Sequence, residues 1–230
     1  MRYSTLLMDA DDTIFDFPRC EYNALRNTLT AWGLDFDDRI YSCFTTINSG
    51  LWRLFEANRI KRSELRVRRF SELMDECFSG SGDPARLADT YVERLAEQAI
   101  FIDGAEDALR ELSQVYRIYL ITNGLKPVQE NRIALSGLDR FISGAFISDA
   151  MNAQKPMKEY FDAVLDAVPE KDTTRLLVVG DSLTSDMQGG RNAGLDTCLY
   201  DPKDRISMPH PLCDYKIHSL TELLRNDEYA

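Results

Sequence analysis

Two aspartates, Asp9 and Asp11, follow a short apolar segment near the N-terminus. They stand two positions apart, so in an extended backbone both carboxylates lean toward one face. One carboxylate could attack phosphorus and form an aspartyl-phosphate. The other, if its acidic surroundings keep it protonated, could protonate the leaving oxygen and later activate water. A solvated acidic turn at the end of a strand is the ordinary alternative.

A second set of polar residues follows later apolar segments. Thr122 closes the run YRIYLIT and is followed by Asn123 and Gly124, so a hydroxyl and two backbone amides could donate to phosphoryl oxygens. Lys155 precedes Pro156 and an expected helix start, where an ammonium could neutralise charge that builds during transfer. A strand ending in an Asn-Gly turn and a solvated lysine are the ordinary alternatives.

Two more aspartates lie in the segment GDSLTSD at 180–186. Asp181 ends an apolar run, where a charge in a buried strand needs a partner. Asp186 stands near the start of the next helix, and either Ser185 or Asp186 could be a helix cap instead of a functional group.

The combination points to one kind of chemistry. Four carboxylates would repel a dianionic phosphate unless a cation lay between them, and ligands that are all oxygen favour Mg²⁺. The sequence therefore predicts metal-assisted phosphoryl transfer to an aspartate. The predicted metal set is Asp9, Asp11, Asp181 and Asp186.

The elements that must position these side chains alternate along the chain. Apolar runs that are typical of buried strands alternate with helical patterns, which predicts an α/β fold with a doubly wound, mostly parallel, Rossmann-like sheet. Ligands of such sheets bind beyond the carboxyl ends of the strands, where the residues above stand. The expected strands are 3–8, 116–122, 141–148, 175–180, 197–200 and 214–217.

The segment 17–102 breaks this alternation. It contains four helical patterns, near 18–32, 38–58, 63–78 and 84–100. The simplest interpretation is a helical cap domain at 17–102, inserted into an α/β core made of 1–16 and 103–230.

Composition limits the partners. The 27 Lys and Arg against 38 Asp and Glu give a net charge of −11, which provides no general attraction to nucleic acids or anionic membranes. Five scattered cysteines, no signal peptide and no apolar run of membrane-spanning length predict a soluble cytoplasmic protein. The expected partner is a small phosphorylated substrate, and the oligomeric state is left open.

The sequence also resembles a known family over essentially its whole length. The segments DADDT at 9–13, TNG at 122–124, KP at 155–156 and GDSxxxD at 180–186 match, in order, the four motifs of the haloacid dehalogenase-like phosphohydrolases. The resemblance implies Asp9 as nucleophile and Asp11 as general acid/base with its carbonyl oxygen on Mg²⁺. It further implies phosphoryl binding by Thr122 and Lys155, metal ligation by Asp181, and Asp186 as either a ligand or an anchor behind the ligands.

Details of the motifs narrow the resemblance. Asp11 occupies the general-acid position that dehalogenase members lack, while Asp12 stands where the family often has glycine. The helical insert looks like the cap of subgroup one. The segments DADDTIFDF at 9–17, INSGLWRLF at 47–55 and QKPMKEYF at 154–161 resemble bacterial nucleoside 5′-monophosphatases that act on pyrimidine nucleotides.

Three cap residues are candidates for substrate selection. Trp52 could stack on a base, and Asn48 and Arg53 could bind its polar edge. The helical spacing of Leu51, Trp52 and Phe55 favours packing within the cap for Trp52.

The sequence thus predicts a Mg²⁺-dependent phosphatase of small phosphomonoesters, most of all nucleoside 5′-monophosphates. The alternatives within the enzymes are a sugar-phosphate or phosphoglycolate phosphatase, or a mutase. Outside them stand a phospho-accepting switch and a Mg²⁺-binding scaffold. The switch is disfavoured because the acceptor ends the first strand, the chain is about twice the length of such a module, and a second acidic pair follows at Asp181 and Asp186.

Overall fold

A parallel sheet organises the computed structural model, which describes residues 2–80 and 82–224. In these residues six strands lie in the order β3-β2-β1-β4-β5-β6, and all neighbours run parallel. The strands are β1 (Thr5–Met8), β2 (Arg117–Thr122), β3 (Gly144–Ile147), β4 (Leu176–Gly180), β5 (Asp196–Tyr200) and β6 (Tyr215–Ile217). The predicted fold class, a doubly wound Rossmann-like sheet, is confirmed.

Five of the six expected strands contain the observed one, and the fifth, expected at 197–200, is one residue too short because β5 begins at Asp196. Most of the differences lie at the amino ends. The largest is in the third, where Phe141 follows a short 3₁₀ turn (Leu138–Arg140) and only Gly144–Ile147 pair with β2. Phe141 and Ile142 pack against the core from this connection. Apolar residues can therefore be buried without belonging to a strand, which is why the run looked longer in the sequence.

Both faces of the sheet are apolar. Leu6 and Met8 of β1 point into one core cluster, and Leu7 between them points into the other. The same alternation occurs in β2 and β4, because successive side chains of a strand project to opposite faces. A sheet that is covered on both sides needs such continuous apolar strands.

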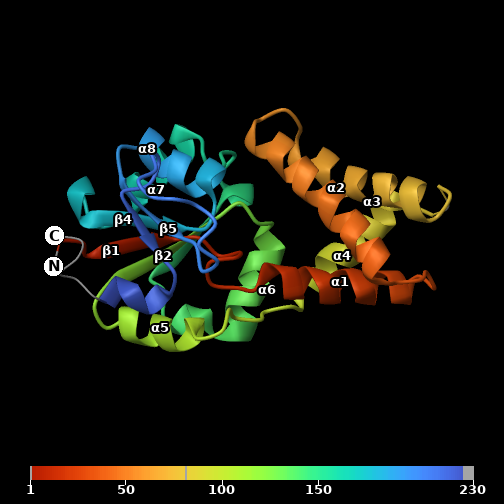
Figure 1. Cartoon of the computed structure of the whole chain (residues 1–230), viewed down its shortest axis with the longest axis horizontal. Coiled ribbons are helices and arrows are strands. Elements are labelled where there is room, and N and C mark those ends of the chain that lie inside the picture. The colour runs from red at the N-terminus through yellow and green to blue at the C-terminus, as the bar shows by residue number, and fades with distance from the viewer. Residues whose placement is uncertain (1, 81, 225–230) are drawn as a thin grey trace. The chain divides into compact units, whose positions relative to one another are not determined.

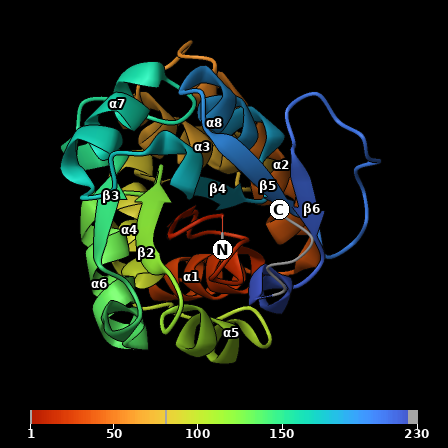
Figure 2. The same ribbon diagram turned by 90° about the vertical axis from the view of Figure 1, so that its left-hand side faces the viewer.

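Helices cover the two faces (Figures 1 and 2). On one face lie α5 (Ala105–Leu112), α6 (Lys126–Ser136) and the 3₁₀ turn Leu220–Leu224; on the other lie α7 (Lys158–Ala167) and α8 (Gln188–Asn192). Pro127 occupies the first turn of α6, where its missing N–H costs nothing. Helix α7 begins at Lys158 after Met157, so Pro156 precedes the helix.

A helical unit forms the rest of the described chain. Compactness divides the chain into an α/β unit, residues 1–17 with 99–230, and a helical unit, residues 18–98. The helices here are α1 (Phe17–Ala31), α2 (Asp38–Glu56), α3 (Arg62–Cys77) and α4 (Pro84–Ala96). Asp37 and Asp83 cap α2 and α4 by accepting bonds from backbone N–H groups.

Aromatic packing closes the helical unit. The rings of Phe44, Phe70 and Tyr91, from α2, α3 and α4, lie with centroids 5.4 to 5.5 Å apart and are fully buried. That this helical unit acts as a cap domain over the active site stays a prediction. No helix of the described residues is long and apolar enough to cross a lipid bilayer.

Close packing of α8 on the sheet depends on Gly190. A methyl group at this position would lie 2.6 Å from Cγ2 of Thr197 and 3.2 Å from Cγ2 of Val178. We expect Gly190→Ala to lower the free energy of unfolding by about 2 kcal/mol through overpacking. Gly144→Ala is the matched control, since its methyl would meet Tyr119 at an ordinary 3.5 Å. Urea denaturation of both variants tests this, and an equal effect of the two would contradict the packing argument.

Candidate active site

The candidate site lies at β1, where the order of the strands switches: β2 and β3 lie on one side of β1, and β4, β5 and β6 lie on the other. β1 pairs with β2 on one side and β4 on the other, with Met8 beside Leu120 and Val179. Asp9 follows Met8, and Thr122 and Asp181 stand two residues beyond those partners. Their side chains therefore meet at the carboxyl edge of the sheet, where ligands of such folds bind.

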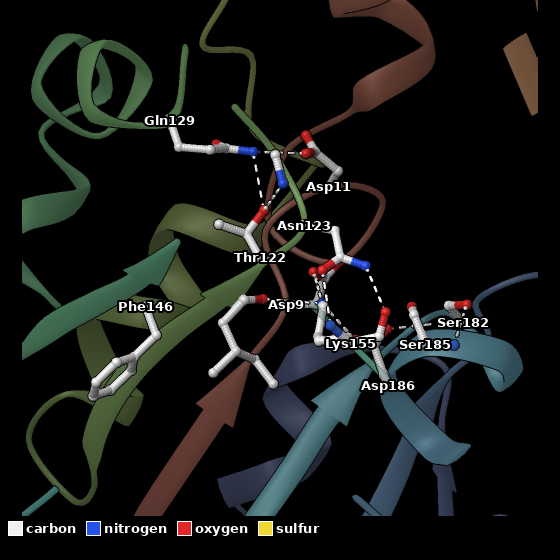
Figure 3. A network of polar contacts seen from close by, with 12 residues as sticks. Asp9, Asp11, Thr122, Asn123, Gln129, Phe146, Lys155, Ser182, Ser185 and Asp186 are labelled. Atoms are coloured by element: carbon white, nitrogen blue, oxygen red, sulfur yellow. Dashed lines mark hydrogen bonds and ion pairs between the residues drawn. The ribbon is translucent and has the colours of Figure 1, made fainter. Parts of the chain in front are cut away.

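Lys155 is the centre of this site (Figure 3). Its side chain is 2% exposed, and its ammonium donates to Oδ1 of Asp9, to Oδ1 of Asp186 at 2.6 Å and to the carbonyl oxygen of Ile121 at 3.0 Å. These acceptors use all three N–H groups of the ammonium. Burial acts to lower the pKa of Lys155, but the carboxylates of Asp186 and Asp9 outweigh it and raise the pKa above its usual value.

Asn123 holds the backbone of Lys155. Its side-chain amide donates to the carbonyl oxygen of Lys155 at 2.9 Å and accepts from the backbone N–H of the same residue at 3.0 Å. The segment that carries Lys155 is thereby fastened to the end of β2. The side chain of Asn123 is thus engaged with Lys155, and phosphate binding by Asn123 stays a prediction.

Asp186 is fully buried, and its two oxygens have different partners. Oδ1 binds the Lys155 ammonium, and Oδ2 accepts from the backbone N–H of Ser182 at 3.1 Å. A methyl group on Gly180 would overlap this carboxylate, so glycine is required beneath it. The cap of the helical turn 183–187 is Ser182, whose hydroxyl accepts from Ser185 N–H, so neither Ser185 nor Asp186 is the cap.

An acidic cluster lies around the lysine. Carboxylate oxygens of Asp9, Asp181 and Asp186 lie within 4.8 Å of one another. Burial raises the pKa of Asp9 well above its usual range, against the opposing charge of Lys155. Burial, with the charges of Asp9 and Asp186, likewise raises the pKa of Asp181. One ammonium does not balance three carboxylates, and an all-oxygen donor set of this size fits a hard divalent cation.

The carboxylate of Asp11 points elsewhere. Its Oδ1 accepts from Arg132 Nη1 at 2.6 Å. Its Oδ2 accepts from Gln129 Nε2 at 2.8 Å (Figure 3). Both partners belong to α6 and are buried. Sequence reasoning missed them. Two polar side chains three positions apart, one turn beyond the Asn-Gly turn, were the available signal.

The loop after β1 turns at Asp12. This residue has a left-handed backbone with φ +61°, and its N–H donates to the carbonyl oxygen of Phe15 at 2.8 Å. Glycine adopts this conformation without strain, which explains its frequent use in the family, and aspartate is among the few other residues that tolerate it. Burial, with the charges of Asp11 and Asp16, raises the pKa of Asp12 to about 6.

All three cap candidates make contacts within the helical unit, and two of them are at least partly buried. Asn48 is buried and donates to Oε1 of Glu21 at 2.7 Å. The ring of Trp52 packs edge-on against Phe55 with centroids 5.5 Å apart, which agrees with the packing interpretation. Arg53 is exposed, and its Nε donates to the carbonyl oxygen of Ser49 at 3.3 Å.

Comparison with known proteins decides the family. The family model of the haloacid dehalogenase-like hydrolases matches residues 3–194. The chain belongs to this family. The resemblance found in the sequence is therefore confirmed, and the protein is an enzyme.

Individual relatives cover nearly all of this hydrolase. It is 40% identical to the putative HAD-hydrolase YfnB of Bacillus subtilis over 96% of this chain and 94% of the relative. A magnesium-bound crystal structure of YfnB covers 98% of both chains with a TM-score of 0.92. The pyrimidine 5′-nucleotidase PynA of Streptococcus pneumoniae is 34% identical over 97% of this chain and 94% of its own. The pyrimidine 5′-nucleotidase YjjG of Escherichia coli is 27% identical over 97% of both.

The backbone at Asp12 gives a test of the loop. We expect Asp12→Gly to match the wild-type free energy of unfolding within about 1 kcal/mol, because glycine relieves the left-handed strain. Asp12→Val should lose about 2 kcal/mol or more, because a β-branched residue is strained at φ +61°. Chemical denaturation of the two variants measures the difference. A valine variant as stable as the glycine variant would contradict it.

Proposed function

We propose that this hydrolase removes phosphate from nucleoside 5′-monophosphates, pyrimidine nucleotides above all, with Mg²⁺ as cofactor and an aspartyl-phosphate on Asp9 as intermediate. The observation that carries the proposal is the buried contact of Asp9 and Asp186 with the Lys155 ammonium. This contact supports the proposal because the carboxylate of Asp9, the proposed nucleophile, lies beside a fixed positive charge, which phosphoryl transfer requires.

The class of reaction is established more firmly than the substrate. The enzyme is a phosphoric monoester hydrolase, because it belongs to the hydrolase family and is 34% and 27% identical to two pyrimidine 5′-nucleotidases over nearly its whole length. The sequence predicted this class. The alternatives of a switch and of a non-catalytic scaffold are therefore discarded.

The donors of the acidic cluster fit the proposed cation. Asp9 and Asp181 would hold Mg²⁺ together with the backbone carbonyl of Asp11, and Asp186, whose oxygens already bind Lys155 and Ser182, would anchor the cluster from behind. When bound, the cation offsets the negative charge of the phosphoryl oxygens. The magnesium-bound structure of YfnB supports this proposal.

In the proposed first step, a carboxylate oxygen of Asp9 attacks phosphorus. A bond forms between that oxygen and phosphorus, and the bond between phosphorus and the ester oxygen breaks. Asp11 gives its proton to the leaving oxygen, so the product leaves as an alcohol. The Lys155 ammonium, whose three N–H groups already bind protein oxygens, would act on the phosphoryl oxygens through its positive charge. The hydroxyl of Thr122 would donate a hydrogen bond to one of them.

The second step returns the enzyme to its first state. Asp11 accepts a proton from water, the water oxygen bonds to phosphorus, and the bond to Asp9 breaks. Inorganic phosphate is released, and Asp11 is again protonated. A mutase would instead pass the phosphoryl group to a second organic acceptor.

The remaining features support the substrate and the compartment. PynA and YjjG act on pyrimidine nucleotides by their names, and both align with the helical unit as well as the core, since they cover 97% of the chain. We assign substrate selection to the helical unit, as the family resemblance implies. The five cysteines are free, which agrees with the reducing cytoplasm as the proposed location.

A substrate panel tests the function. We expect phosphate release to be fastest from pyrimidine nucleoside 5′-monophosphates, slower from sugar phosphates and phosphoglycolate, and lost in excess EDTA, since the acidic cluster then lacks its cation. Added Mg²⁺ should restore activity. Faster release from the sugar phosphates or from phosphoglycolate would overturn the nucleotide assignment, and full activity in EDTA would overturn the metal.

Substitution of the two aspartates tests the mechanism. We expect Asp9→Asn to abolish turnover while the melting temperature stays close to that of wild type, because the nucleophile is lost. Asp11→Asn should lower kcat by about a hundredfold or more, the usual contribution of general acid-base catalysis. Glu130→Gln, an exposed change on α6, is the control. A near-normal turnover rate in Asp9→Asn would contradict an aspartyl-phosphate intermediate on Asp9.

A further inference from the structure

We infer that Gln129 and Arg132 are positioning residues, which set the carboxylate of Asp11 and the hydroxyl of Thr122 for catalysis from one helix. This inference rests on the proposed function, in which Asp11 transfers the proton and Thr122 holds the phosphoryl group. Neither residue lies in the four motif segments, 9–13, 122–124, 155–156 and 180–186. The contacts of α6 carry the argument.

Arg132 fixes one oxygen of Asp11. Its side chain is fully buried and donates from Nη1 to Asp11 Oδ1 at 2.6 Å. The guanidinium lies over the ring of Phe15, with Cζ 4.4 Å from the ring centroid. Because the ring and the carboxylate both orient the guanidinium, its direction is set by packing as well as by charge. A flexible surface pair would not define the carboxylate in this way.

Gln129 fixes the other oxygen of Asp11 and the hydroxyl of Thr122 together. Its Nε2 donates to Asp11 Oδ2 at 2.8 Å and to Thr122 Oγ1 at 3.1 Å. Gln129 is 1% exposed, and its Oε1 has no hydrogen-bond partner among the described residues. An unpaired buried acceptor costs about 1–3 kcal/mol, so this orientation is not explained by stability alone.

The contact also determines what the Thr122 hydroxyl can do. Its oxygen accepts from Gln129 Nε2 and from the backbone N–H of Gly124 at 3.0 Å. A hydroxyl has two acceptor sites and one donor, so both acceptor sites are occupied. No acceptor for its own hydrogen is present among the described residues, and this hydrogen remains for an external oxygen. Gln129 thus makes Thr122 a donor, as phosphoryl binding needs.

The backbone that carries these side chains is closely packed. Gln129 and Arg132 are three positions apart in α6, so they project from neighbouring positions on one side of the helix. A methyl group on Gly124 would overlap the amide of Gln129, so the turn after β2 packs directly on this side chain. The phosphoryl-binding turn and the proton-transferring loop are therefore joined by a single amide.

Two phosphate esters separate this role from a structural one. p-Nitrophenyl phosphate has a leaving group that needs little protonation, whereas uridine 5′-monophosphate, or the best alkyl ester of the panel, needs an acid. We expect Gln129→Met, which keeps the length and removes the donors, to slow aspartyl-phosphate formation from the alkyl ester about tenfold more than from the nitrophenyl ester. Rapid-quench measurements in single turnovers give both rates.

The loss of the Thr122 contact has its own signature. Since both esters carry the same phosphoryl group, Gln129→Met should raise KM for the two by a similar factor. Arg132→Met should show the leaving-group effect, and Arg132→Lys should recover part of the rate. Glu130→Gln on the same helix should change neither quantity. Thermal melts report whether each variant is folded. If Arg132→Met does not fold, Gln129→Met alone tests the inference.

Repeating the Gln129→Met substitution in an Asp11→Asn enzyme shows whether Gln129 acts on the leaving group through Asp11. If Gln129 acts through Asp11, its substitution adds no further leaving-group effect there. Equal slowing of both esters by Gln129→Met would overturn the inference while leaving the proposed function intact, provided that Asp11→Asn itself discriminates between them. If Asp11→Asn does not discriminate, the proposed role of Asp11 fails, and the positioning role fails with it.

Discussion

The site depends on one buried ammonium. Lys155 lies at the carboxyl edge of the sheet with its three N–H groups on Asp9, Asp186 and the carbonyl of Ile121. Without it, two carboxylates would face each other in a region of low dielectric constant, which is costly in free energy. Other features serve this contact: Asn123 fastens the lysine's backbone, and Gly180 leaves room for the Asp186 carboxylate.

A second network of polar contacts joins Gln129 and Arg132 of α6 to Asp11, and it differs in charge and in position from the contacts of Lys155. The acidic cluster brings together carboxylate oxygens of Asp9, Asp181 and Asp186, whereas Gln129 and Arg132 direct the Asp11 carboxylate toward α6. Two aspartates only two residues apart are thereby given different surroundings. Such a division suits a pair in which one residue attacks and the other transfers a proton.

Much of the fold could be predicted because the apolar pattern is strong. The strand runs are short, bounded and continuous, as buried parallel strands require, and the four ordered motifs place their polar residues at strand ends. The pattern was less informative where burial does not imply pairing, as at Phe141, or where a cap could be any of several residues. Ser182 caps the turn 183–187 because its hydroxyl reaches Ser185 N–H, a contact that residue types alone do not reveal.

The sequence by itself determined the fold class and the family, and it predicted which residues could bear chemistry, because hydrophobic periodicity and motif order are local properties of the chain. Only the tertiary structure decided which side chains form hydrogen bonds and ion pairs with one another. Gln129 and Arg132 lie 118 and 121 positions from Asp11. Spacing along the chain carries no information about such contacts, which exist because β1 and β2 are neighbours in the sheet and α6 packs beside them.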